Sequence, residues 1–153
     1  MMGGDMSNEN VVQMKERSQT TGLIGELLEE RKQVWSMYCA VSGIEEHKGQ
    51  KSIEELVQDF CQLSVDYISL GHFGVYQRIL DGNERRKSVL AAAERIYPNI
   101  SKATEVVLDF SDKYQKLTPA MILNELANDL STVGEHLANR IELEDELIGE
   151  MLA

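Results

Sequence analysis

Cysteine and histidine are scarce, and neither is arranged for a disulfide framework or a metal site. Cys39 and Cys61 both fall in predicted helices, where a small buried hydrophobe is the usual role of cysteine. The three histidines, His47, His72 and His136, stand singly and lack the spacing of zinc ligands. We therefore expect no disulfide bond and no structural metal.

Long apolar runs and positive charge are also scarce. No run approaches the roughly 18 apolar residues of a membrane span, and the opening residues, MMGGDMSNEN, lack the charged start and apolar middle of a secretory signal. We expect a cytoplasmic protein without a membrane segment. The formal net charge is -11, and nucleic-acid binding relies on lysine and arginine at the phosphates. Direct binding of DNA or RNA is therefore not expected, and the acidity favours a basic protein partner.

The motifs of common catalytic sites are missing. No nucleophile elbow, phosphate loop or dinucleotide fingerprint occurs, and the glycines of SLGHFGVY match no phosphate cradle. Metal-binding helical bundles use a Glu-x-x-His repeat, but Glu135 and His136 are adjacent and point about 100° apart on a helix. We therefore expect no enzymatic activity and no cofactor.

Helical signals dominate the rest of the chain, which has only two prolines and no strand-like alternation. Residues 1–18 are polar and weakly periodic, so we expect a weakly ordered segment that is frayed or forms one marginal helix. Residues 19–153 suit a single helical-bundle domain. The predicted fold is all-α, an antiparallel up-and-down bundle with a long C-terminal helix.

Capping and turn residues predict where several helices begin and end. A first helix should follow Thr20 or Thr21 and end at Gly43, with a loop over residues 44–51. Ser52 with Glu55 forms a capping box for the second helix.

Signals in the second half divide it into further helices. Residues 81–83, DGN, predict a turn, and the next helix should stop before Pro98, because the residue ahead of proline avoids helical angles. Another helix follows it. Thr118 caps the last helix, with Pro119 at its first position, and this helix should be the longest. Its apolar stripe comprises Ile122, Leu126, Leu130, Val133, Leu137, Ile141 and Ile148.

The second helix, around residues 59–80, carries the candidate site. Its apolar residues share one face, and the opposite face carries an outer stripe. If the helix continues through Gly71, this stripe includes Gln62, Asp66, Ser69, Phe73 and Tyr76, with His72 beside it. Gly71 and Gly74 each cost about 1 kcal/mol in a helix, and a break there would turn both aromatics toward the core. Both alternatives are open from the sequence.

Three blocks resemble a bacterial anti-sigma family, the one that includes the regulator of sigma D and the alginate regulatory protein AlgQ. They are VDYISLGHFGVYQRIL at 65–80, RIYPNISKAT at 95–104, and GEHLANRIELEDELI at 134–148. The last contains Arg140, Leu143, Glu144 and Asp145 in the family pattern. A fourth block, 27–44, fits more loosely, because the family usually has Trp near the position of Leu27; Trp35 is the candidate to pack in its place.

The resemblance implies a helical bundle that binds the primary sigma factor of RNA polymerase. It implies binding to the sigma domain that reads the −35 promoter element, which reduces the availability of sigma to polymerase and promoter DNA. In this sequence we assign Asp66 to pair with a basic residue of sigma, and Phe73 and Tyr76 to supply apolar contact area. Ser69 and Gln62 form the rim, and His72 lies beside it.

An alternative function is a homo-oligomeric scaffold or adaptor with another basic protein partner. It would use a second apolar edge of the last helix, formed by Met121, Leu143, Leu147 and Met151. This edge could instead thicken the core, and we expect a monomer or weak dimer. The acidic residues that crowd the same helix, Glu142, Glu144, Asp145, Glu146 and Glu150, are typical of a solvated helix face.

Overall fold

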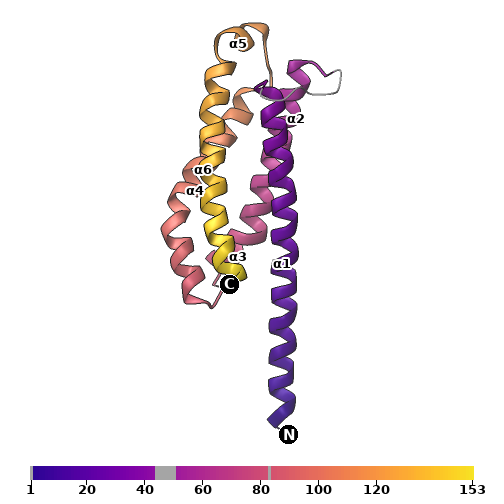
Figure 1. Cartoon of the computed structure of the whole chain (residues 1–153), viewed down its shortest axis with the longest axis vertical. Helices are drawn as coiled ribbons and strands as arrows, with labels where there is room; N and C mark the ends of the chain where they lie inside the picture. Colours follow the sequence, from indigo (N-terminus) through magenta and orange to yellow (C-terminus); the bar gives the residue numbers. More distant parts are fainter. Residues whose placement is uncertain (1, 44–50, 83) are drawn as a thin grey trace.

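Four long helices alternate in direction in the computed structural model, which describes residues 2–43, 51–82 and 84–153 (Figure 1). The described residues contain no strand. The predicted all-α, antiparallel up-and-down bundle with a long C-terminal helix is confirmed. The elements are α1 (Met2–Val41), α2 (Ile53–Gly71), the π-helical turn η1 (His72–Tyr76), α3 (Gln77–Leu80), α4 (Lys87–Lys113), α5 (Pro119–Asn124) and α6 (Leu126–Leu152).

The four long helices enclose one core. α1 packs on α2 and α6, and α4 packs on the same two helices from the other side. Each long helix contributes side chains that are almost completely buried, such as Leu27, Phe60, Ile96 and Leu137. Burying such a side chain contributes about 1.5–3 kcal/mol, so this shared interior holds the bundle together.

The first helix is longer than predicted. α1 begins at Met2 rather than after Thr20 or Thr21, so α1, and not the C-terminal helix as predicted, is the longest. Its N-terminal part projects beyond the bundle (Figure 1). Before Gln19, side chains are described only for Val11 and Met14, and both are exposed. The division into a weakly ordered segment, 1–18, and a domain, 19–153, stays a prediction.

Three of the predicted caps are present, at Gly43, Ser52 and Thr118, whereas Thr20 and Thr21 lie inside α1. Gly43 follows the end of α1 with a φ of 78°, which glycine adopts without steric cost. The backbone amide of Glu55 donates to Ser52 Oγ at 3.2 Å at the start of α2. The amide of Met121 donates to Thr118 Oγ1 at 3.3 Å at the start of α5. Most of the predicted loop, residues 44–50 with His47, and Asn83 of the predicted turn lie outside the described residues.

Two predicted boundaries in the second half are wrong. α4 continues through Pro98, and Pro98 lies on the exposed side, where water can bind the carbonyl that the missing amide leaves free. Ile96 and Ile100 on either side of it are buried, so packing holds the helix together there. Conversely, the predicted last helix is divided at Glu125, whose φ of −128° and ψ of −34° separate α5 from α6.

The apolar stripes of the predicted helices face the core, although Ile122 and Ile141 are only partly buried. The second apolar edge of the last helix also packs inward: Leu147 and Met151 are buried, and Met121 and Leu143 pack against the core. The scaffold alternative therefore loses the apolar surface on which it depended. Cys61 is buried as predicted, and burial raises the pKa of its thiol to about 11.

None of the helices in the described ranges combines the length and the apolar character that a membrane crossing requires.

α1 and α6 approach closely where Tyr38 meets Gly134. The Tyr38 hydroxyl donates to the carbonyl of Leu130 at 3.0 Å, and its ring lies 5.9 Å from that of Phe60. A Cβ atom added at Gly134 would overlap the hydroxyl end of Tyr38. Glycine at this position therefore makes room for the tyrosine.

Gly134→Ala should destabilise the protein by about 1–3 kcal/mol, because Tyr38 must leave its hydrogen bond and its packed position. Gly149→Ala is the matched control on the same helix, since a Cβ there has no atom within 4 Å. The control variant should be stabilised by up to about 1 kcal/mol, because alanine has a higher helix propensity than glycine. Denaturant unfolding measures both variants, and equal stabilisation of the two would contradict this account.

Candidate partner-binding surface

The outer face of α2 presents the predicted polar residues to solvent. Gln62, Asp66 and Ser69 are all exposed. The Gln62 side-chain amide donates to the Asp66 carboxylate at 3.0 Å, which orients that carboxylate on the surface. The sequence prediction that these residues share an exposed face is confirmed.

Phe73 continues this face at the start of η1. It lies two turns beyond Asp66, and its side chain is 69% exposed. The half-buried His72 packs edge to face against the Phe73 ring, with ring centroids 4.9 Å apart. A phenylalanine this exposed leaves a large apolar area in contact with water in the free protein, so it is suited to contact a partner.

The prediction that Tyr76 faces solvent is wrong, because Tyr76 is only 3% exposed. The helix neither continues regularly nor breaks: residues 72–76 form a π-helical turn. Such a turn accommodates one extra residue, which sets later side chains back by about 100°. Phe73, at the start of the turn, stays outside, whereas Tyr76, at its end, points into the core.

Tyr76 points toward a buried polar cluster. The side chains of Arg140 and Glu144 on α6 are each 1% exposed, and Arg140 Nε lies 3.6 Å from Glu144 Oε2. The Tyr67 hydroxyl donates to Glu144 Oε2 at 2.6 Å. The Arg140 guanidinium also lies over the rings of Tyr67 and Tyr76, at 5.4 and 5.7 Å from their centroids, and donates to Thr104 Oγ1.

This cluster was missed in the sequence, where Glu144 was placed on a solvated face. Burial, more than any neighbouring charge, raises the pKa of the Glu144 carboxyl, while Tyr67, Arg140 and Arg31 oppose that change. Burial and then the Glu144 carboxylate raise the pKa of Tyr67 and Tyr76. A signal was available: Arg140 and Glu144 are four residues apart and in phase with the apolar stripe of α6.

Gly71 lets the cluster approach α2. A Cβ atom added at Gly71 would lie 3.2 Å from Arg140 Nη2 and 3.4 Å from Leu27 Cδ1. Leu27 itself is completely buried, whereas Trp35 is 38% exposed. The expectation that Trp35 packs at the Leu27 position is therefore wrong.

α1 adds acidic residues beside Asp66. Burial raises the pKa of Glu30, and the nearby carboxylates of Asp66 and then Glu26 raise it further. Glu30 Oε2 is buried and has no hydrogen-bond partner among the described residues. We call Glu26, Glu30, Asp66 and Phe73 the acidic surface. Glu26 and Glu30 were missed in the sequence, because only the tertiary structure brings α1 beside α2.

The described parts of the chain contain no cluster of potential metal ligands. No group of three or more histidine, cysteine, aspartate or glutamate side chains there is arranged to hold a metal ion.

Comparisons with known proteins agree on one family. The profile of the family described as "Regulator of RNA polymerase sigma(70) subunit, Rsd/AlgQ" matches residues 6–152. A Regulator of sigma D from Yersinia enterocolitica is 35% identical over 130 residues, which cover 82% of this chain and 78% of the relative. A Regulator of sigma D from Shigella dysenteriae is 36% identical over 131 residues, covering 82% and 81%.

Arg140→Met should destabilise the protein by about 3 kcal/mol at neutral pH, because it leaves the Glu144 carboxylate buried without its nearest cation. The loss should shrink as the pH falls. The pKa of Glu144 in the folded state is raised above its ordinary value of 4.5, so at acidic pH the carboxyl is neutral in both folded and unfolded states. Denaturant unfolding across this pH range measures the effect.

The double variant Arg140→Met with Glu144→Gln is the control, because it removes both charges. It should recover most of the stability that the single variant loses. A double variant no more stable than Arg140→Met would show that lost packing, rather than the unpaired charge, causes the effect.

Proposed function

The chain belongs to the Rsd/AlgQ family of regulators of the RNA polymerase sigma(70) subunit, and we propose that it binds the primary sigma factor in the cytoplasm. The proposed target is the sigma domain that reads the −35 promoter element. The proposed effect is that fewer sigma molecules reach polymerase and promoter DNA. Competition for binding surfaces suffices for this effect, so the proposal requires no catalysis and no cofactor.

Charge supports a basic partner. A promoter-reading helix-turn-helix domain presents cationic side chains to the DNA phosphates. The acidic surface offers the carboxylates of Glu26, Glu30 and Asp66, contributed by two adjacent helices. A cationic side chain that reaches between α1 and α2 would supply a partner for Glu30 Oε2, which has none in the described structure. The same cation would then no longer be available to DNA.

The exposure of Phe73 is the single observation on which the proposal mainly rests. Its ring is 69% exposed and lies on the same face as the Asp66 carboxylate. Hot spots of interfaces combine a large apolar anchor with charged or polar neighbours, and truncating one typically costs about 2 kcal/mol or more. Gln62, Ser69 and His72 lie around Phe73 and Asp66 and form the proposed rim. Tyr76 no longer belongs to the contact set, because it is buried.

Phe73→Ala should weaken binding to purified primary sigma factor by about 2 kcal/mol, which is about thirtyfold in Kd. Its unfolding free energy should stay close to that of the unchanged protein, since the ring is exposed. Leu123→Ala is a matched control, because Leu123 is 84% exposed on α5, at the other end of the bundle (Figure 1). Calorimetry should show an unchanged Kd for this control.

Tyr76→Phe tests whether Tyr76 belongs to the contact surface or to the core. It removes only a buried hydroxyl near the Glu144 carboxylate, so affinity for sigma should change less than twofold, within the usual scatter of neutral interface positions. A loss as large as that of Phe73→Ala would return Tyr76 to the contact surface and contradict its assignment here.

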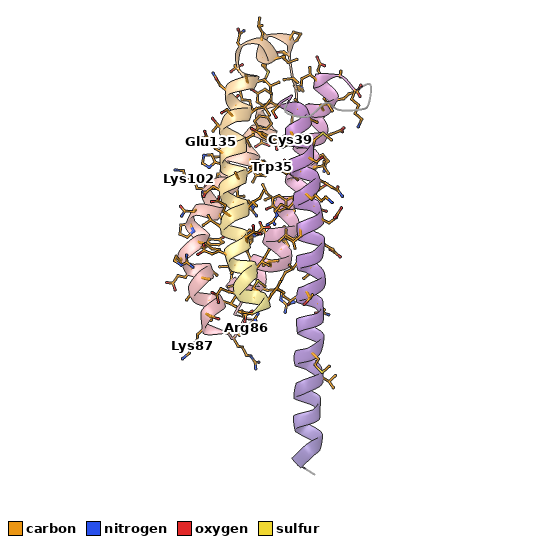
Figure 2. All side chains as sticks on the ribbon, in the orientation of Figure 1. Trp35, Cys39, Arg86, Lys87, Lys102 and Glu135 are labelled. Atoms are coloured by element: carbon orange, nitrogen blue, oxygen red, sulfur yellow. The ribbon has the colours of Figure 1, made fainter. Side chains whose placement is uncertain are left out.

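Asp66→Asn, and to a smaller extent Glu30→Gln at the half-buried Glu30, should slow association with sigma and reduce its dependence on salt, because surface charges steer encounter and are screened by ions. Stopped-flow association at several ionic strengths measures both effects. Glu135→Gln on α6 is the control, an equal loss of one exposed charge away from α2 (Figure 2). If all three variants behave alike, only the net charge of the protein matters and the acidic surface has no special role.

A further inference from the structure

A groove of about 340 Å³ lies between α1 and α6, and no residue of the acidic surface lines it. Its floor is apolar and its rim carries two cationic side chains. Trp35 lies on the part of α1 that faces α6 (Figure 2). The lining residues are Leu28, Arg31, Lys32, Trp35, Ala138 and Ile141.

The two cationic residues in the lining, Arg31 and Lys32, contrast with the formal net charge of -11 for the chain. No carboxylate is among the lining residues. Lys32 is exposed and makes no ion pair with any residue that the structure describes. The Arg31 guanidinium lies 2.7 Å from Asp145 Oδ1 and 3.8 Å from Glu144 Oε1, so its charge is already compensated. Lys32 therefore supplies the unpaired positive charge of the lining, and Arg31 adds hydrogen-bond donors.

Trp35 supplies an aromatic wall. Its ring stacks on Tyr38, with centroids 5.3 Å apart and planes inclined by 25°. The residue nevertheless remains 38% exposed and lines the groove. An indole held on one side by a second ring is a rigid platform for stacking another flat ring.

We propose that this groove binds a small anion that carries a flat aromatic ring, the chemical class of the nucleotides. The ring would stack on Trp35 over the apolar floor of Leu28 and Ile141, and the phosphates would contact Lys32 and Arg31. The volume is at the small end of ligand sites, which suits such a molecule and not a folded partner. This site is independent of the proposed binding of sigma.

Asp145 predicts a change in ligand affinity opposite in sign to that expected for Lys32. Its carboxylate is 55% exposed and already pairs with Arg31, so it competes with an incoming phosphate and repels it. Removing its charge should therefore strengthen binding, whereas removing the charge of Lys32 should weaken it. An unspecific attraction to the whole protein would respond equally to charges placed anywhere.

ATP is the probe, and Trp35 is its reporter, because the chain contains a single tryptophan. Saturable quenching of Trp35 fluorescence at millimolar ATP or below is expected, with calorimetry as a second measurement. Lys32→Gln should weaken binding about tenfold, the value of one charge-assisted contact. Asp145→Asn should tighten it. Lys102→Gln, the matched control on α4 at the other side of the bundle (Figure 2), should leave it unchanged.

Three results would overturn the proposal. The first is the absence of saturable quenching and of heat at millimolar ATP. The second is equal weakening by Lys32→Gln and Lys102→Gln, which indicates attraction without a site. The third is equal affinity for inorganic tripolyphosphate, which excludes a contribution from the ring. Sigma binding by the Lys32→Gln protein should remain intact, so failure here and failure of the proposed function are distinguishable.

Discussion

The buried pair of Arg140 and Glu144 is the constraint on which the rest of the bundle depends. Two groups that are 1% exposed cannot be left without partners, because an unpaired charge in the interior is costly. Their partners come from every other long helix: Arg31 from α1, Tyr67 from α2 and Thr104 from α4. Any slip of one helix would separate these atoms, so the cluster helps to set the register of all four.

The same constraint connects the interior with the proposed partner surface. Tyr76 at the end of η1 lies against the Arg140 guanidinium, while Phe73 at its start faces solvent. A regular α-helix would place both rings on one side, and the π turn separates them. The contact of Tyr76 with Arg140 inside the bundle and the exposed position of Phe73 therefore both follow from the π-helical turn η1. Gly71, just before η1, allows the close approach of Arg140 that makes this possible.

Local signals predicted much of the fold. Ser52, Thr118 and Gly43 marked helix ends correctly because capping depends on a few neighbouring residues. Pro98 misled, because the packing of its buried neighbours Ile96 and Ile100 keeps the chain helical despite the local cost of proline. Glu144 also misled, because a carboxylate is normally expected at the surface, and its buried partners Arg140 and Tyr67 are known only from the tertiary structure.

The sequence by itself determined the fold class, the apolar faces and the exposed stripe of α2, since these follow from periodicity within one helix. It also carried the blocks that identify the family. Only the tertiary structure decided that Tyr76 is buried, that Glu30 lies beside Asp66, and that Trp35 and Lys32 share a groove with α6. These facts depend on how separate helices pack, and no periodicity along one helix records its neighbours.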